Sequence, residues 1–394
     1  MHGSEFGDPG LRAAMEAELR ARLREGRPLR VYAGYDPTAP DLHLGHAITL
    51  RKLRQFQDSG HDVTFLVGTF TAEVGDASDR LSGRPPKSPE AIARDAQTYA
   101  EQCYTILDRS RTSVVYNGDW LRDRTLSDVI RLASHFTVQQ FLVRDNYRKR
   151  LDAGNPVGLH EFFYALLQGY DAVHLQADVQ LGATEQLFNI QAGRKLQEAF
   201  GQKPCVCLTF PILVGTDGRD RMSKSKGNYV GILEPPEQQF GKTMSISDET
   251  LLEWIPYVSG WSVDEIEQRS KGLRDGSLHP MEEKKRLAGA IVAQFHGVEA
   301  AAAAQAAFES VHQQGRLPED MPELVLGAPE ALIEVLLRLE GVPSKAEARR
   351  LLLGRGVRVD GETIEDPHAV LASDCTLQVG KRRFARVRFS KPAG

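Results

Sequence analysis

Two polar segments of this 394-residue chain carry side chains suited to handling phosphate groups. The first holds His43 and His46, three positions apart at the expected start of a helix, where both imidazoles would share one face. A helix start also offers unpaired N–H groups and a positive dipole end to an anion. The pair could therefore stabilise charge on phosphate oxygens, although two histidines alone are more often a packed or solvated feature. Metal binding is less favoured, because neither an HExxH pattern nor a third ligand stands nearby.

The second segment, residues 219–228, reads RDRMSKSKGN. A loop of this kind is usually just solvent-exposed. Here it follows an expected strand, and the carboxyl ends of strands are where open α/β sheets bind their ligands. Cations on such a loop can close over a pyrophosphate.

Alternating strands and helices must position these segments, which predicts a parallel, doubly wound α/β sheet over residues 29–234. Between about 120 and 170 helical signals dominate, which indicates an insertion. The expected strands are 29–35, 63–70, 113–116, 173–177 and 205–213, and the expected helices are 44–57, 89–107 and 185–200.

Proline and glycine mark the remaining boundaries. Residues 235–318 are expected to be a helical domain in which Ser262 and Glu265 form a capping box. A linker at 319–328 precedes a small α/β module at 329–394, where Asp360-Gly361 predicts a hairpin turn. Residues 1–28 form an N-terminal extension, and its first ten residues, which resemble a cloning remnant, are left out of the expected fold.

Composition indicates a globular chain, with 41% hydrophobic and 26% charged residues. The chain lacks an apolar run of roughly 20 residues that could span a bilayer. Charged residues interrupt the first thirty positions, so we expect neither a signal peptide nor a membrane association, and a cytoplasmic location. The four cysteines lack metal or redox spacing and are expected to be buried, inert thiols; they are Cys103, Cys205, Cys207 and Cys375.

Charge is distributed unevenly along the chain. Residues 341–394 carry eleven Lys/Arg against six Asp/Glu, a net of +5, so the remainder carries −9 of the total of −4. A basic end on an acidic body suggests that this end contacts a polyanion.

Together, His-x-Gly-His and Arg-Met-Ser-Lys-Ser resemble the two motifs of class I aminoacyl-tRNA synthetases. The resemblance implies that Thr38, His43 and His46 stabilise the transition state at the α-phosphate of ATP. Arg221 and Lys224 would draw the departing pyrophosphate, and Arg221 stands where the family commonly has lysine. The carboxylate of the amino acid is itself the nucleophile, so positioning and electrostatics suffice. Mg²⁺ would accompany ATP, and no protein metal site is expected.

Residues 164–171 place Tyr164, Gln168 and Asp171 on one helical face. This trio resembles the substrate helix of tyrosyl-tRNA synthetases of the bacterial type. The resemblance implies that Tyr164, Gln168 and Asp76 hold the ammonium group of tyrosine, and that Tyr32 and Asp171 bind its phenolic hydroxyl. Gln186 is the remaining tyrosine-binding residue expected.

The same resemblance implies an ATP site. Gly45 would let adenine approach the backbone, because a side chain there would block it. Glu185 stands where much of the family has aspartate, in the segment expected to contact ribose. The expected ATP-binding residues are Gly34, Asp36, Gly45, Gly182, Glu185, Met222, Ser223 and Lys224.

The basic end resembles an S4-type RNA-binding domain. It implies tRNA contacts by Lys345, Arg349 and Arg350, with Arg80 replacing a family lysine at the acceptor stem. The family also implies a homodimer, with residues 136–141 as the candidate interface. The expected function is tyrosine–tRNA ligase, charging tRNA(Tyr) with L-tyrosine from ATP. Alternatives are a tryptophanyl-tRNA synthetase, a non-catalytic RNA-binding relative, and a small-molecule nucleotidyltransferase.

Overall fold

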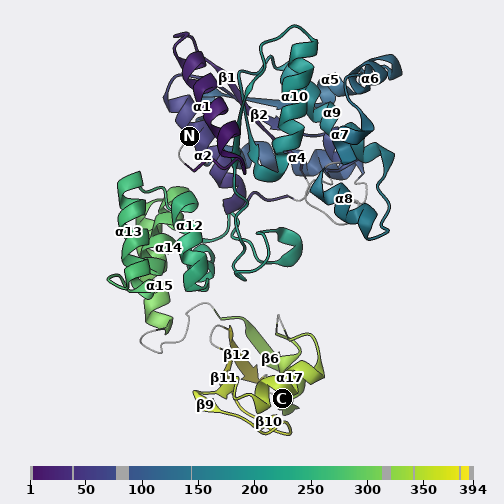
Figure 1. Ribbon diagram of the computed structural model, residues 1–394. Helices are drawn as coiled ribbons and strands as arrows, with labels where there is room; N and C mark the ends of the chain where they lie inside the picture. Colours follow the sequence, from purple (N-terminus) through teal and green to yellow (C-terminus); the bar gives the residue numbers. More distant parts are fainter. Residues whose placement is uncertain are drawn as a thin grey trace. The chain divides into compact units, whose positions relative to one another are not determined.

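The computed structural model describes residues 3–37, 40–76, 88–142, 144–312, 321–339, 342–380 and 383–389. The chain forms two compact units, Met1–Gln305 and Ala306–Gly394 (Figure 1). The finer domain boundaries expected from the sequence stay predictions. Within the described residues, no helix has both the length and the apolar character needed to cross a membrane.

A five-stranded, fully parallel sheet forms the centre of the first unit, as predicted for a doubly wound domain. The strand order is β3-β2-β1-β4-β5, so the chain reverses direction across the sheet between β1 and β4, where such folds bind ligands. The strands are β1 (Arg30–Tyr35), β2 (Asp62–Val67), β3 (Thr112–Tyr116), β4 (Val179–Ala183) and β5 (Val206–Phe210).

The predicted strand at 173–177 is wrong. Helix α9 (Leu159–His174) continues through Val173, and the backbone turns at Gln176, which has a φ of +46°. Strand β4 begins only at Val179. A short apolar run does not distinguish a buried helix end from a strand, and here the interior face of α9 supplied the apolar residues.

Helices α2 (Leu44–Asp58), α4 (Pro89–Cys103) and α10 (Leu187–Ala199) match the predicted helices and pack against the sheet. Short helices fill the predicted insertion between β3 and α9. The remaining elements of this part are α1 (Pro9–Leu23), α3 (Thr71–Val74), α5 (Gly118–Leu121), α6 (Leu126–Ala133), α7 (Val138–Leu142), α8 (Asp145–Asp152) and the 3-10 helices η1 (Arg109–Arg111), η2 (Thr184–Gln186) and η3 (Lys224–Lys226).

The opening residues belong to the fold, contrary to the expectation that they could be left out. Phe6 is buried in the main hydrophobic core. The backbone N–H of Glu5 donates to the carbonyl of Thr209 at 2.7 Å. This contact covers the outer edge of β5, which would otherwise present unpaired backbone groups.

The expected helical region follows the sheet, and all but the end of its last helix belongs to the first unit. Ser262 caps its helix by accepting from the N–H of Glu265, which is one half of the predicted capping box, whereas the Glu265 side chain accepts from Arg269. Gln239 donates to the carbonyls of Gly231 and Ile232. These bonds attach the helices to the segment behind the 219–228 loop. The helices are α11 (Pro236–Met244), α12 (Asp248–Val258), α13 (Val263–Asp275), α14 (Pro280–His296) and α15 (Val298–His312).

The second unit has a mixed five-stranded sheet in the order β6-β12-β11-β8-β9. Asp360 and Gly361 have φ values of +49° and +89°, so the predicted hairpin turn is confirmed between β8 and β9. Strand β6 lies in the stretch expected to be a linker. The elements are β6 (Glu323–Leu326), β7 (Glu330–Ala331), α16 (Leu332–Leu336), α17 (Lys345–Leu353), β8 (Val357–Val359), β9 (Glu362–Thr363), β10 (Val370–Leu371), β11 (Cys375–Val379) and β12 (Arg383–Phe389).

Candidate functional site

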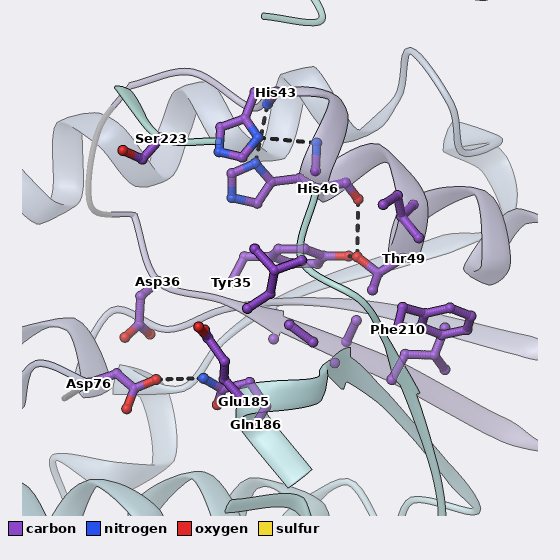
Figure 2. Close-up of a pocket in the computed structure, with 18 of the residues that line it drawn as sticks. Tyr35, Asp36, His43, His46, Thr49, Asp76, Glu185, Gln186, Phe210 and Ser223 are labelled. Carbon is purple, nitrogen blue, oxygen red and sulfur yellow. Dashed lines mark hydrogen bonds between the residues drawn. The ribbon is translucent and has the colours of Figure 1, made fainter. Parts of the chain in front are cut away.

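A cavity of about 890 Å³ opens at the carboxyl ends of β1, β4 and β5 (Figure 2). It brings together the residues that the sequence assigned to tyrosine and ATP. Thr38 and Arg80 lie outside the described residues, so their placement stays a prediction. The predicted residues that line the cavity are Tyr32, Gly34, Asp36, His43, Gly45, His46, Asp76, Tyr164, Gln168, Asp171, Gly182, Glu185, Gln186, Arg221, Met222, Ser223 and Lys224.

Backbone hydrogen bonds join the two segments that were predicted to handle phosphate groups. His43 and Gly231 form an isolated antiparallel bridge. On either side of it, the N–H of Leu44 donates to the carbonyl of Val230 at 3.0 Å, and that of Ile232 donates to Leu42 at 3.1 Å. The chain that leaves the 219–228 loop is therefore paired directly with the start of α2.

The two histidines are adjacent, as their spacing predicted, with ring centroids 4.0 Å apart. His43 precedes α2 as its N-cap and His46 is the third helical residue, so the two rings meet at the start of the helix. The N–H of Gly45 donates to His43 Nδ1, and the N–H of His43 donates to His46 Nδ1, both at 3.2 Å. Because each Nδ1 accepts, each neutral ring carries its proton on Nε2.

Burial keeps both imidazoles neutral. It lowers the pKa of His46 to about 3 and that of His43 well below its usual value, and the nearby positive charge of Lys224 acts in the same direction. Each ring therefore offers a neutral Nε2–H donor near pH 7. The ammonium of Lys224 also lies over the ring of Tyr99, 5.5 Å from its centroid.

Asn228 holds the 219–228 loop at its base. Its Oδ1 accepts from the N–H of Ser223 at 2.8 Å, and its Nδ2 donates to Asp217 Oδ2 at 2.8 Å and to the carbonyl of Arg221 at 3.1 Å. A Cβ on Gly215 would lie 2.2 Å from Asn228 Nδ2. The sequence motif contained Asn228, but its spacing gave no indication of this role.

Arg221 pairs with Glu185, the residue expected near ribose. Their Nη1 and Oε1 atoms are 3.3 Å apart, and both side chains remain partly exposed. A partly exposed pair of this kind is weak. Arg221 can therefore exchange this carboxylate for a phosphate without a large cost.

Asp171 lies at the closed end of the cavity with partners that sequence reasoning missed. Its carboxylate accepts from Trp120 Nε1 at 2.9 Å and from Asn117 Nδ2 at 3.1 Å. Burial nevertheless raises the pKa of Asp171 to about 8. Asn117 directly follows β3, so its place at the carboxyl edge of the sheet was the available signal.

Tyr32 is buried beside Asp171. Burial, and then the charge of Asp171, raise the pKa of the Tyr32 phenol well above its usual value. Within the described part of the chain, its hydroxyl has no hydrogen-bond partner. A buried hydroxyl without a partner is costly, so this end of the cavity favours a ligand that carries a polar group.

The same part of the cavity connects residues that were predicted to act separately, because Asn117 Nδ2 also donates to Thr71 at 3.0 Å. Tyr164 donates to Asp36 Oδ2 at 2.9 Å, and Thr71 donates to Asp36 Oδ1 at 2.7 Å. Thr71 was not predicted. A Cβ on Gly68 would lie 2.0 Å from Asp36 Oδ1, so only glycine leaves room for this arrangement. Gln186 Nε2 donates to Asp76 Oδ2 at 2.6 Å, as Figure 2 shows.

In the second unit the predicted RNA-contacting cations are exposed on one helix, α17. Lys345 pairs with Glu334 and Arg350 with Glu347. Pairs this exposed contribute little, so Lys345, Arg349 and Arg350 can all face a polyanion.

The cysteines are reduced and buried, as predicted. Burial raises the pKa of Cys205 to about 12, so this thiol is unreactive. In the described ranges, no group of three or more His, Cys, Asp or Glu side chains could hold a metal ion.

Comparisons with known proteins found two matching family models and several similar relatives. The family model described as "tRNA synthetases class I (W and Y)" matches residues 24–313, and the S4 domain model matches residues 332–372. The tyrosine–tRNA ligase of Haemophilus influenzae is 46% identical over 377 residues, which cover 95% of this chain and 94% of the relative. That of Aquifex aeolicus is 44% identical over 375 residues, or 94% of each chain.

A solved structure shows the same fold. The tyrosyl-tRNA synthetase of Archaeoglobus fulgidus, determined in complex with L-tyrosine, superposes with a TM-score of 0.59 at 25% identity. The match covers 74% of this chain and 94% of that protein.

Proposed function

We propose, from the premise that this chain belongs to the class I tRNA synthetase family for tryptophan and tyrosine, that it is a tyrosine–tRNA ligase. It activates L-tyrosine with ATP to tyrosyl-adenylate, releases pyrophosphate, and transfers the tyrosyl group to the 3′-terminal ribose of tRNA(Tyr). The single observation that carries this proposal is one cavity lined by the cations Arg221 and Lys224, by the imidazoles of His43 and His46, and by the buried side chains of Asp171 and Tyr32.

The activation step requires stabilisation of charge at the α-phosphate, where the tyrosine carboxylate attacks. The neutral Nε2–H groups of His43 and His46 donate to the phosphate oxygens as that charge develops, and Thr38 assists them. Lys224 and Arg221 balance the charge on the departing pyrophosphate. Magnesium enters with ATP as part of the substrate. The remaining ATP contacts are assigned to Gly34, Asp36, Gly45, Gly182, Glu185, Met222 and Ser223.

Tyrosine is selected by its hydroxyl. Tyr32 and Asp171 bind the phenolic hydroxyl, and phenylalanine would leave the Tyr32 hydroxyl buried without a partner and Asp171 without this additional bond. Asp171→Ala should therefore reduce discrimination against phenylalanine by roughly 10- to 100-fold. If the variant discriminated against phenylalanine as strongly as the wild type, Asp171 would not take part in this selection.

The ammonium group of tyrosine is assigned to Asp76, Tyr164 and Gln168, with Gln186 beside them. Asp76 supplies a carboxylate and Gln168 an amide oxygen, which are the acceptors that an ammonium group needs. Their presence in one cavity supports this assignment.

The tRNA is held by the second unit. Lys345, Arg349 and Arg350 contact phosphates from α17, and Arg80 contacts the acceptor stem. The S4 match supports this role. Contacts of this type weaken as salt concentration rises.

A homodimer completes the proposal. Phe141, in the segment predicted as the interface, is buried within its own subunit. In the same segment Val138 on α7 is 58% exposed, and before it Leu126 and Ile130 on α6 are 75% and 61% exposed. Such a surface suits a partner. Ile130→Glu should shift the mass measured by light scattering from dimer to monomer. The enzyme is assigned to the cytoplasm.

The test is pyrophosphate exchange into ATP with each of the twenty amino acids. Tyrosine alone should support rapid exchange. Exchange with tryptophan and not tyrosine would make the protein a tryptophanyl enzyme, and no exchange with any amino acid would favour a non-catalytic RNA-binding protein.

A further inference from the structure

Asn189, on α10, lies directly behind the cavity and joins two of its side chains. It is fully buried and does not line the cavity. Its Nδ2 donates to Gln168 Oε1 at 3.1 Å and to Gln186 Oε1 at 3.0 Å. One amide group thus uses both of its N–H donors on two glutamines that arrive from different segments of the chain.

The direction of these hydrogen bonds is fixed from both ends. Arg144 Nη1 donates to Asn189 Oδ1 at 3.4 Å, and a guanidinium group can only donate. The oxygen of Asn189 must therefore face Arg144, which turns its NH₂ group toward the glutamines. At the other end, a carboxylate can only accept, so the NH₂ group of Gln186 must face Asp76.

We propose that Asn189 is a positioning residue for recognition of the tyrosine ammonium group, through its hydrogen bonds to Gln168 and Gln186. This inference rests on the proposed function. An ammonium group donates only, so it requires acceptors around it. By donating to the amide oxygen of Gln168, Asn189 prevents this amide from turning over. The oxygen has a second lone pair, which can accept from the ammonium group.

Asn189 acts on Asp76 by a second route. With its oxygen bound to Asn189, Gln186 can only offer its NH₂ group to Asp76, and this bond orients the carboxylate. Loss of the Asn189 donor would allow Gln186 to turn over and set its oxygen against Asp76. Both acceptors for the ammonium group would then be misplaced together.

The experiment measures KM for tyrosine and KM for ATP in pyrophosphate exchange. Asn189→Asp keeps the size of the side chain and replaces both N–H donors with an acceptor. We expect KM for tyrosine to rise about tenfold or more, with KM for ATP changed less than about twofold. Gln191→Glu is the matched control, since it makes the same amide-to-acid change at an exposed position of α10 and should alter neither constant.

A double-mutant cycle separates positioning from general support of the fold. If Asn189 acts through Gln186, then Asn189→Ala combined with Gln186→Ala should raise KM for tyrosine by clearly less than the product of the single effects. Thermal unfolding of each variant reports whether it is folded. If the alanine variant does not fold, Asn189→Ser replaces it. Serine keeps one donor in a smaller side chain, so KM for tyrosine should rise less.

Two results would overturn the proposal: an unchanged KM for tyrosine in folded Asn189 variants, or parallel rises in both KM values. Multiplicative effects in the cycle would also reject it. These failures differ from failure of the proposed function, in which wild-type protein would show no exchange with tyrosine.

Discussion

His43 and Gly231 are joined as an antiparallel β-bridge, which pairs the start of α2 with the chain that leaves the 219–228 loop. The bridge explains how imidazoles and cations from distant parts of the sequence reach one cavity. The same pairing attaches the chain that follows Lys224 to the start of α2.

His46→Ala should slow tyrosyl-adenylate formation by roughly 10²- to 10³-fold while changing the affinity for tyrosine little. The His46 donor is expected to act mainly on the charge of the transition state. Rapid-quench measurement of adenylate formation, beside equilibrium tyrosine binding, separates the two effects. Equal losses in both would argue against this role. Because burial lowers the pKa of His46 to about 3, the wild-type rate should not follow titration of this group between pH 6 and 8.

Asp171→Asn should change stability in a pH-dependent way. In the ligand-free protein burial raises the pKa of Asp171 to about 8 from 3.8, so the unfolded chain releases this proton first. Ionisation therefore costs the folded state increasingly as pH rises from about 4 to about 8. The Tm of the variant minus that of the wild type should therefore increase across this interval and be constant below it. Asp152→Asn, at an exposed position, is the control, and a pH-independent difference would contradict the expectation.

Gly45→Ala should slow activation by roughly 10- to 100-fold by displacing His43. A Cβ at this position would lie 3.0 Å from Cε1 and 3.1 Å from Nδ1 of the His43 ring. Gly289→Ala on α14 is the matched control, because nothing lies within 4 Å of its added Cβ. The control should have wild-type activity and equal or higher stability, since alanine favours a helix. An unchanged rate of activation in Gly45→Ala would mean that the His43 ring can shift away from the added methyl group without reducing the rate.

Asn228→Ala should raise KM for ATP and lower kcat by roughly tenfold, while KM for tyrosine stays near its wild-type value. The substitution leaves the N–H of Ser223 and the carboxylate of Asp217 without their Asn228 bonds, which loosens the loop that carries Lys224. Pyrophosphate exchange at varied ATP and tyrosine gives both constants. Asn155→Ala, at an exposed asparagine, should behave as wild type, and a selective effect of Asn228→Ala on tyrosine would contradict the loop's assignment.

Removal of residues 313–394 should spare adenylate formation and abolish most charging of tRNA. The cut precedes β6, which pairs with β12 and so belongs to the second unit. In the full chain, the tRNA affinity should fall steeply between about 50 and 200 mM salt if α17 neutralises several phosphates. Normal charging by the truncated enzyme would show that the basic unit does not hold the tRNA.

The sequence by itself determined the doubly wound sheet and most of the residues that line the site. Periodicity and turn residues are local properties, so they placed most strands and helices correctly. The two motifs and the Tyr164, Gln168, Asp171 face are also local patterns, and every one of their described members lines the cavity. The error at 173–177 arose because a buried helix end and a buried strand have the same apolar composition.

Only the tertiary structure decided the partners of these residues. Thr71 and Asn189 gave no separate signal, and Asn117 gave only its place after β3, because each is an ordinary polar residue whose role depends on a side chain from another segment. The structure also shows that His43 caps α2 and that Arg221 pairs with Glu185. Hydrogen bonds between distant segments depend on strand order and helix packing at the scale of an ångström, which residue spacing along the chain does not encode.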